Sequence, residues 1–435
     1  MQPTDARRSF PPYRTTSAQA GPALGFVLLL SYLPFEFILR ANTMRIPLVL
    51  SVLLLITWFL HPKKIWTPQI VCFLLFLAFM AIHVPFTENT YPAFWMTYNL
   101  LGILVFFCIP LIHIIDSLHK LRLFIYVWLT LLAYMGIYAI FHAGFGPAGA
   151  AGAQDENYVA ASMVMVFPFA YFLIFFEKAL LRRLLLLASL AVFIGATVVT
   201  ESRGGMLGMG VVLLCCMLRS PKKWVAVVLA GAVILGTWIY APPSFWTEMG
   251  TIGDTEEATA DTRLEFWKLA FRMFLDYPIL GVGPANFPWN ITYYQTEDQY
   301  QKFGRALAAS VVTHSLYFEL LAEMGGVGAI LFLTIVFRTS RDLRRIARLP
   351  TPSGDPARVP PLNRPNRAGR ALTDEIRLTQ QLEKALTASL AGFFVIATFL
   401  SYLYASSFWY LVSIGIVLQQ TTQHLLRNAM HTPRE

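Results

Sequence analysis

Two arginines and one histidine have the residue types and positions to carry chemistry in this chain. Arg203 lies in the short polar turn TESRGG (200–205), between two apolar blocks. A guanidinium at such a boundary is unfavourable unless it is paired, and the glycines after it would let a ligand or another backbone come close. Arg203 is therefore predicted to bind an anion, with a local ion pair to Glu201 as the alternative.

The second arginine, Arg263, lies in a segment with the form of a helix start. The sequence TRLE (262–265) matches a capping box, which predicts a helix from Thr262 to about Leu275, before a Tyr-Pro pair. A first-turn arginine is unfavourable beside the positive end of the helix dipole, so a partner should offset it. That partner is either an anionic ligand or an acid such as Asp261.

Helical geometry separates Arg263 from the other cations of this predicted helix. Arg263 shares the apolar face of Trp267, which should pack on the rest of the protein. Glu265, Lys268 and Arg272 have the spacing i, i+3, i+7 and form an ordinary solvated stripe. Arg263 is the stronger candidate for a site residue, and Arg272 is kept as a secondary one.

The histidine, His314, begins the sequence HSLYFE (314–319), which leads into another apolar block. A histidine needs little adjustment of its pKa to act as a general base near neutral pH. A single histidine at a helix end is more often structural, so spacing alone leaves both roles open. Tyr317, one turn further along, and Arg305, upstream, are secondary candidates.

Other polar segments give weaker signals. Asp155 and Asn157 follow a Gly- and Ala-rich stretch (145–153), which is either a flexible connector or a loop that reaches a ligand. The acidic run GDTEE (253–257) lacks the Asp-x-Asp pattern of a metal-bound diphosphate and should be solvated. The four cysteines lie in apolar segments without zinc spacing. The sequence therefore predicts no metal site, and nothing in it indicates a cofactor.

The elements that must position these residues are long apolar segments. The chain is 56% hydrophobic and 14% charged, and its apolar residues form blocks of about 20 residues, as in transmembrane helices. The pattern predicts an all-α polytopic membrane protein of about twelve transmembrane helices; very short turns leave ten or eleven open. The predicted spans are 22–38, 44–60, 68–84, 95–115, 121–143, 157–176, 180–198, 204–218, 223–241, 314–337, 384–400 and 402–423.

The distribution of Lys and Arg predicts the orientation, because positive loops are retained in the cytoplasm. Most of the 34 basic residues fall in segments on one side of the predicted spans. The net charge of +9 reflects this bias, so anionic lipids, and not nucleic acid, are the expected partners. The predicted order is a cytoplasmic tail (1–21), nine spans (22–241), a large, partly helical periplasmic loop (242–313), a tenth span (314–337), a basic, Pro-rich cytoplasmic loop (338–383), two spans (384–423) and a cytoplasmic tail (424–435).

These motifs resemble those of the O-antigen ligase family of bacterial membrane glycosyltransferases, which also contains O-antigen polymerases and protein O-oligosaccharyltransferases. The resemblance rests on ESRGG (201–205), on RLEFW (263–267) followed by DYPILGVG (276–283), and on HSLY (314–317) with Gly325-Gly326. A single large outer loop agrees with it. The N-terminal spans are similar to the family only in hydropathy.

The resemblance implies a GT-C-like protein of the bacterial inner membrane that transfers a glycan from undecaprenyl diphosphate at the periplasmic face, without metal or cofactor. Carried over by motif, Arg203 and Arg263 would bind the diphosphate, and His314 would be the general base for the acceptor hydroxyl. Size, span number and the single loop favour a ligase with lipid A core as acceptor. A polymerase and a protein transferase remain the alternatives.

A lipid or solute transporter is the competing hypothesis from another class of protein. Transporters have charged residues near the bilayer midplane, paired broken helices and an inverted repeat. The sequence has few such charges and no evident repeat, whereas its polar candidates gather at one predicted surface. A third possibility, a structural membrane scaffold, would leave the outer arginines replaceable.

Overall fold

The computed structural model is a bundle of helices, and every regular element among its described residues is helical. The structure describes residues 23–37, 46–62, 64–150, 152, 155–241, 243–250, 258–297, 299, 311–349 and 367–431. Each of the twelve apolar ranges that the sequence predicts as spans overlaps a helix. The helices are α1 (Ala23–Phe37), α2 (Ile46–Phe59), α3 (Pro68–His83), η2 (Val84–Phe86), α4 (Thr90–Leu101), η3 (Gly102–Cys108), α5 (Ile109–Ile114), α6 (Leu118–Phe141), α7 (Glu156–Ile174), α8 (Leu180–Val199), α9 (Arg203–Arg219), α10 (Lys223–Tyr240), α11 (Pro243–Gly250), α12 (Ala258–Asp276), α13 (Phe287–Tyr294), α15 (Leu316–Ala347), α16 (Arg367–Ile396) and α17 (Ser406–His431).

Apolar helices of membrane-spanning length make this a multi-pass membrane protein. Among the described residues, six helical segments are long and apolar enough to cross a bilayer, and α1 and α2 are shorter apolar helices. The number twelve stays a prediction. The six segments are Pro68–Phe86, Thr90–Ile114, Leu118–Phe141, Glu156–Ile174, Leu180–Val199 and Leu316–Ala347.

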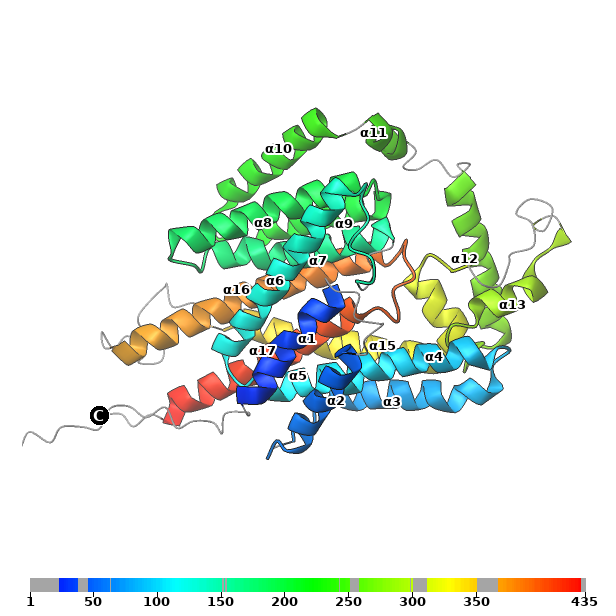
Figure 1. Cartoon of the computed structure of the whole chain (residues 1–435), viewed down its shortest axis with the longest axis horizontal. Helices are drawn as coiled ribbons and strands as arrows, with labels where there is room; N and C mark the ends of the chain where they lie inside the picture. Colours follow the sequence, from blue (N-terminus) through cyan, green and yellow to red (C-terminus); the bar gives the residue numbers. More distant parts are fainter. Residues whose placement is uncertain are drawn as a thin grey trace, which may run out of the picture.

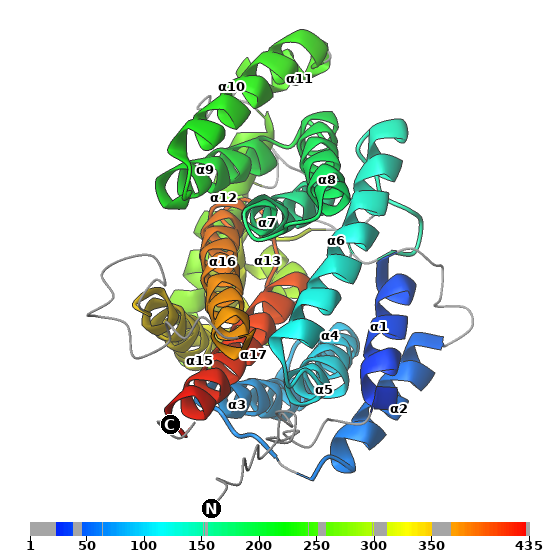
Figure 2. The ribbon, with the colours of Figure 1, turned by 90° about the vertical axis from the view of Figure 1, so that its left-hand side faces the viewer.

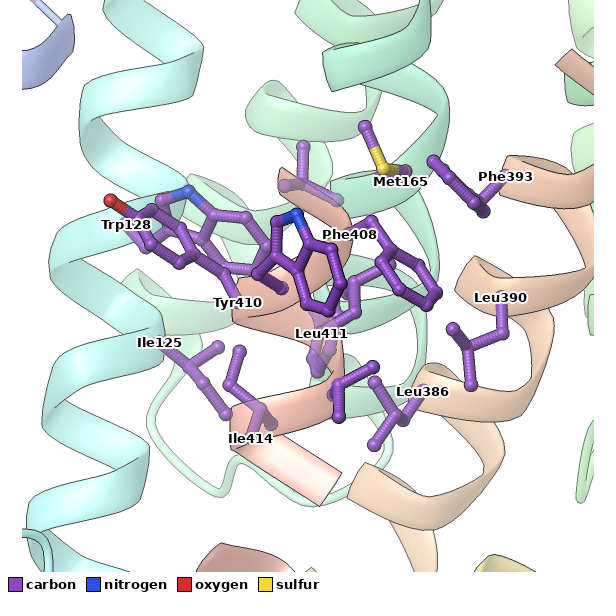
Figure 3. Close-up of a cluster of buried hydrophobic side chains, with 14 of the residues drawn as sticks. Ile125, Trp128, Met165, Leu386, Leu390, Phe393, Phe408, Tyr410, Leu411 and Ile414 are labelled. Carbon is purple, nitrogen blue, oxygen red and sulfur yellow. The ribbon is translucent and has the colours of Figure 1, made fainter. Parts of the chain in front are cut away.

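The centre of the bundle is formed by α7 and α16, which pack along each other, with α17 and α6 beside them. Figure 3 shows Trp128 of α6, Met165 of α7, Phe393 of α16 and Phe408 of α17 converging in one apolar cluster. The rings of Phe393 and Phe408 are stacked with centroids 5.0 Å apart. Such close packing stabilises helices in lipid, where apolar burial alone gives little driving force.

Two glycines bring α9 close to α16. A Cβ on Gly208 of α9 would lie 2.4 Å from Ile396, and a Cβ on Gly392 of α16 would lie 2.4 Å from Val212. Small residues at such positions let two helix backbones approach. The contact fixes the N-terminal end of α9, which begins at Arg203, against the C-terminal end of α16.

The elements farther from this centre fall into two groups. α10 and α11 lie beyond α9 at one edge of the molecule, at the top of both views (Figures 1 and 2). At one end of the bundle, α12 packs on α15 and on α13. The arrangement places the first residues of α7, α9 and α15 and the last residues of α16 near α12.

The structure changes two of the predicted boundaries. α12 begins at Ala258, so Thr262 lies inside the helix and the predicted capping-box start was wrong by four residues; alanine, the strongest helix former, lets the helix extend upstream. Helical structure also extends into the predicted cytoplasmic loop, through Ala347 and again from Arg367. The proline-rich centre of that loop (350–366) lies outside the described residues.

Candidate active site

A cavity of about 610 Å³ lies where the ends of α7, α9, α12 and α16 meet. Arg203 and Arg263, the two arginines singled out in the sequence, both line it. Its wall also contains polar groups from Asn157 and Ser202 and apolar groups such as Phe399. Two cations from different helices thus share one space whose lining contains both polar and apolar groups.

Arg203 is placed by the start of α9. Ser202 is the N-cap residue: its Oγ accepts a hydrogen bond from the backbone N–H of Gly205 at 3.1 Å, as N-cap serines commonly do. The same hydroxyl donates to Oδ1 of Asn157 at 2.7 Å. The cap therefore joins α9 to the first turn of α7 and fixes the backbone from which Arg203 extends.

The two glycines after Arg203 have different roles. A Cβ on Gly205 would lie 2.6 Å from Cβ of Ala160, so this glycine is required by the packing of α9 on α7. Gly204 lines the cavity, where a Cβ would meet Phe399 at 3.4 Å. Room for a ligand, which the sequence suggested for both positions, applies to Gly204 alone.

The turn before Arg203 has an unusual backbone. Glu201 has a positive φ of 51°, a conformation that non-glycine residues adopt rarely and that often marks functional sites. Glu201 lines the cavity together with Arg203. The turn from α8 to α9 thus brings one acidic and one basic residue, Glu201 and Arg203, to the lining of the cavity.

Arg263 is placed by the packing of α12 on α15. The predicted orientation of this helix is confirmed, because Ala270 is fully buried and Trp267 stacks on Phe318, with ring centroids 5.2 Å apart. The indole N–H of Trp267 also donates to the backbone carbonyl of Thr313 at 2.9 Å. The helix face that holds Arg263 is therefore fixed beside the segment that contains His314.

His314 lies between two residues with fixed positions. The hydroxyls of Thr313 and Ser401 lie 3.0 Å apart, and the N–H of Leu316 donates to the carbonyl of Ala397 at 2.9 Å. His314 itself has a φ of 49°, which these contacts on both sides help to maintain. His314 is not among the residues described as lining the cavity. Arg263 does line the cavity, and its charge acts on the imidazole of His314.

The surroundings of His314 favour the neutral form of its imidazole. Burial lowers the pKa of His314 below its ordinary value, and the positive charge of Arg263 lowers it further, while the carboxylate of Asp155 opposes both. A neutral imidazole has one nitrogen free to accept a proton. These charges connect Arg263 and Asp155 with His314 electrostatically.

The secondary candidates have separate positions. Asp155 is the N-cap residue of α7 and accepts a hydrogen bond from the N–H of Asn157 at 2.7 Å. Tyr317 donates its hydroxyl to the carbonyl of Phe394 at 2.8 Å and links α15 to α16. Arg272 is exposed on the solvated face of α12, where Lys268 pairs with Glu265 at 2.7 Å. Arg305 lies outside the described residues.

The sequence did not reveal how two glycine-containing motifs pair. The N–H groups of Val282 and Gly283 donate to the carbonyls of Ala322 and Glu323, each at 2.8 Å. Gly325 breaks α15, with φ 56° and ψ −160°. The turn after α12 is therefore inserted at a break in α15, and the glycine pairs at 281–283 and 325–326 were the available signal.

Residues 188–333 match the family model described as O-antigen ligase, which confirms the resemblance predicted from the motifs. The matched range contains Arg203, Arg263 and His314, as well as both motifs that pair at the break in α15. No curated protein matches the chain.

Proposed function

We propose that this protein, which carries the O-antigen ligase family domain over residues 188–333, transfers a glycan from undecaprenyl diphosphate to lipid A core. The observation that supports the proposal most directly is the cavity shared by Arg203 and Arg263. Two guanidiniums that line one cavity suit a diphosphate, because each can donate two parallel hydrogen bonds to phosphate oxygens.

In the proposed reaction the acceptor hydroxyl attacks the anomeric carbon of the lipid-linked sugar with inversion. The bond between that carbon and the diphosphate oxygen breaks, and the leaving diphosphate takes the electron pair. Arg203 and Arg263 stabilise the negative charge that develops on it. His314 accepts the proton of the attacking hydroxyl and later releases it to water.

The amphiphilic wall of the cavity fits a lipid-linked sugar. Ile396, Phe399 and Leu400 give the lining apolar groups, and Arg203 and Ser202 give it polar groups. The polyprenyl chain would extend from the apolar groups into the bilayer, and the sugar diphosphate would lie against the polar groups. In this proposal the chain spans the inner membrane about twelve times, and the end with α12 faces the periplasm.

The break in α15 is a feature of the described helices that would also suit a transporter. Transporters use paired broken helices whose free backbone groups bind the cargo. Here the groups at the break are occupied, since the N–H groups of Gly326 and Val327 donate to the carbonyls of Pro278 and Ile279, at 2.8 and 3.1 Å. The break therefore holds a protein turn, which favours the transferase.

Transfer by purified protein in detergent would test the proposal. The donor is undecaprenyl-diphosphate glycan, the acceptor is lipid A core, and EDTA is present to test whether a divalent metal is needed. Wild type should form product, His314→Ala and Arg263→Ala should lose it, and Arg272→Ala should retain it as a matched control on the same helix.

Three other outcomes would change the assignment. Chain growth with the lipid-linked repeat alone would indicate a polymerase. Transfer to a Ser- or Thr-containing peptide would indicate a protein transferase. A wild type inactive with all three acceptors would refute glycan transfer.

A further inference from the structure

Two buried carboxylates have no part in the proposed reaction, yet they lie in the first two turns after His314. Glu319 is 8% exposed and Glu323 is 3% exposed, and the two are one helical turn apart on α15. A buried carboxylate is tolerated when donors or opposite charges satisfy its oxygens. The donors around these two residues therefore indicate what the carboxylates hold in place.

Glu323 accepts three hydrogen bonds from two different segments. The N–H of Ala285 lies 2.8 Å from Oε2, and the N–H of Phe287 lies 3.1 Å from Oε1. The hydroxyl of Tyr404, in the connection between α16 and α17, donates to Oε2 at 2.6 Å. A carboxylate can accept on both oxygens, whereas a glutamine would turn a donor toward one of these N–H groups.

Glu319 contacts the same connection at Leu403, the residue before Tyr404. Its Oε2 accepts the backbone N–H of Leu403 at 3.1 Å. Leu403 and Tyr404 are thus held by two successive turns of α15. The path of the connection between α16 and α17 (397–405) depends on these two carboxylates.

The other side of this connection supports His314. Ser401 is in hydrogen-bond contact with Thr313, the residue before His314, and Ala397 accepts from Leu316, two residues after it. The left-handed backbone of His314 is therefore supported by a connection that Glu319 and Glu323 hold through hydrogen bonds to Leu403 and Tyr404. Glu323 in addition holds the turn that follows α12, the helix of Arg263.

We infer that Glu323 is a positioning residue for His314. Glu323 acts through the α16–α17 connection and is assisted by Glu319. The inference rests on the proposed function, in which His314 is the base. Glu323 touches neither the substrate nor the reacting atoms in this scheme. Its role is to keep the base and the turn after the arginine-bearing helix in one fixed relation.

The kinetic test compares Glu323→Gln and Glu323→Asp with a control. Glu383→Gln is the control, because Glu383 is also 3% exposed and pairs with Arg219 at 2.9 Å. Glu383 lies on α16 about 20 Å of helix before Ile396, the residue of α16 that lines the cavity. Glu323→Gln should lower kcat roughly 10- to 100-fold, as expected for a displaced catalytic group, with KM for the donor nearly unchanged. Glu323→Asp, which keeps both oxygens, should recover part of kcat.

A second readout needs no transfer activity. Diethylpyrocarbonate modifies neutral imidazoles, and mass spectrometry of the His314 peptide gives the rate against pH. Glu323→Gln should raise this rate several-fold and move its midpoint toward the ordinary pKa of histidine, while Glu383→Gln should leave both as in the wild type.

The two measurements separate the failure of each idea. A wild type that transfers to no acceptor refutes the proposed function, and the modification rates still decide whether Glu323 positions His314. A kcat and a modification profile of Glu323→Gln equal to those of the wild type overturn the inference. An equal change in both properties in Glu383→Gln overturns it as well, because the effect would then be general destabilisation.

Discussion

The indole N–H of Trp267 donates to the carbonyl of Thr313, the residue before His314, at 2.9 Å. The hydrogen bond joins α12, which carries Arg263, to the segment that carries the candidate base. The same indole stacks on Phe318, with an angle of 17° between the rings. One side chain thus makes both a polar and an apolar contact between the helix of Arg263 and the segment of His314.

Trp267→Phe should remove the hydrogen bond to Thr313 while a ring still fills the position beside Phe318. The phenyl ring keeps most of the stacking on Phe318 but has no donor for Thr313, so about 1 kcal/mol of stability should be lost. Transfer should fall by more than stability does, because a small misplacement of reacting groups lowers the rate steeply. Thermal unfolding in detergent and kcat measure the two effects. Trp246→Phe, at an exposed position of α11, should change neither, and a Trp267→Phe enzyme with normal kcat would contradict the role given to this bond.

The pH dependence of transfer should follow the titration of His314. The base acts in its neutral form, so kcat/KM should rise as pH increases through the pKa of His314, which burial and Arg263 hold below the ordinary value of a histidine. Asp155→Asn removes the charge that raises this pKa. The acid limb of the profile should therefore move to lower pH in this variant, and a limb that moves to higher pH would contradict the arrangement.

The sequence predicted the helical architecture better than it predicted the connections between helices. Apolar length identified the helices because backbone groups in a bilayer must be satisfied within each segment. Helical rotation also placed the packing face of Arg263, since Trp267 and Ala270 recur with helical spacing. That Arg203 and Arg263 line one cavity depends on how the rest of the bundle places α9 and α12, which a local pattern does not contain.

The turn after α12 shows the same limit. Gly281 and Gly325 were visible as members of two motifs, but their pairing joins segments far apart in sequence. The buried acids Glu319 and Glu323 lie within a range that the sequence predicted as one apolar span (314–337). Their partners, Leu403 and Ala285, lie in loops whose paths depend on the folded bundle.

Gly281→Ala should disrupt the junction between this turn and α15. Gly281 has a φ of 73°, and a Cβ there would lie 2.5 Å from the backbone of Glu323. The left-handed strain and the clash together should cost roughly 2 kcal/mol or more, seen as a lower unfolding temperature in detergent. Gly210→Ala is the matched control, since a Cβ at Gly210 meets nothing within 4 Å, and a helical alanine should be neutral or stabilising by up to about 1 kcal/mol. Equal melting of the two variants would rule out close docking of the turn.

Ser202→Ala tests how the start of α9 places Arg203. The substitution removes the cap of α9, worth about 1 kcal/mol, and the bond to Asn157 at 2.7 Å. If this cap orients Arg203 toward the donor diphosphate, KM for the lipid-linked donor should rise several-fold, whereas kcat at saturating donor should change less, because His314 is held by other contacts. Ser202→Thr keeps a hydroxyl that can cap the helix and should retain most of the affinity. Steady-state kinetics with varied donor separates the two parameters; an unchanged KM in Ser202→Ala, with α9 still folded by circular dichroism, would show that Arg203 does not depend on its cap to bind the donor.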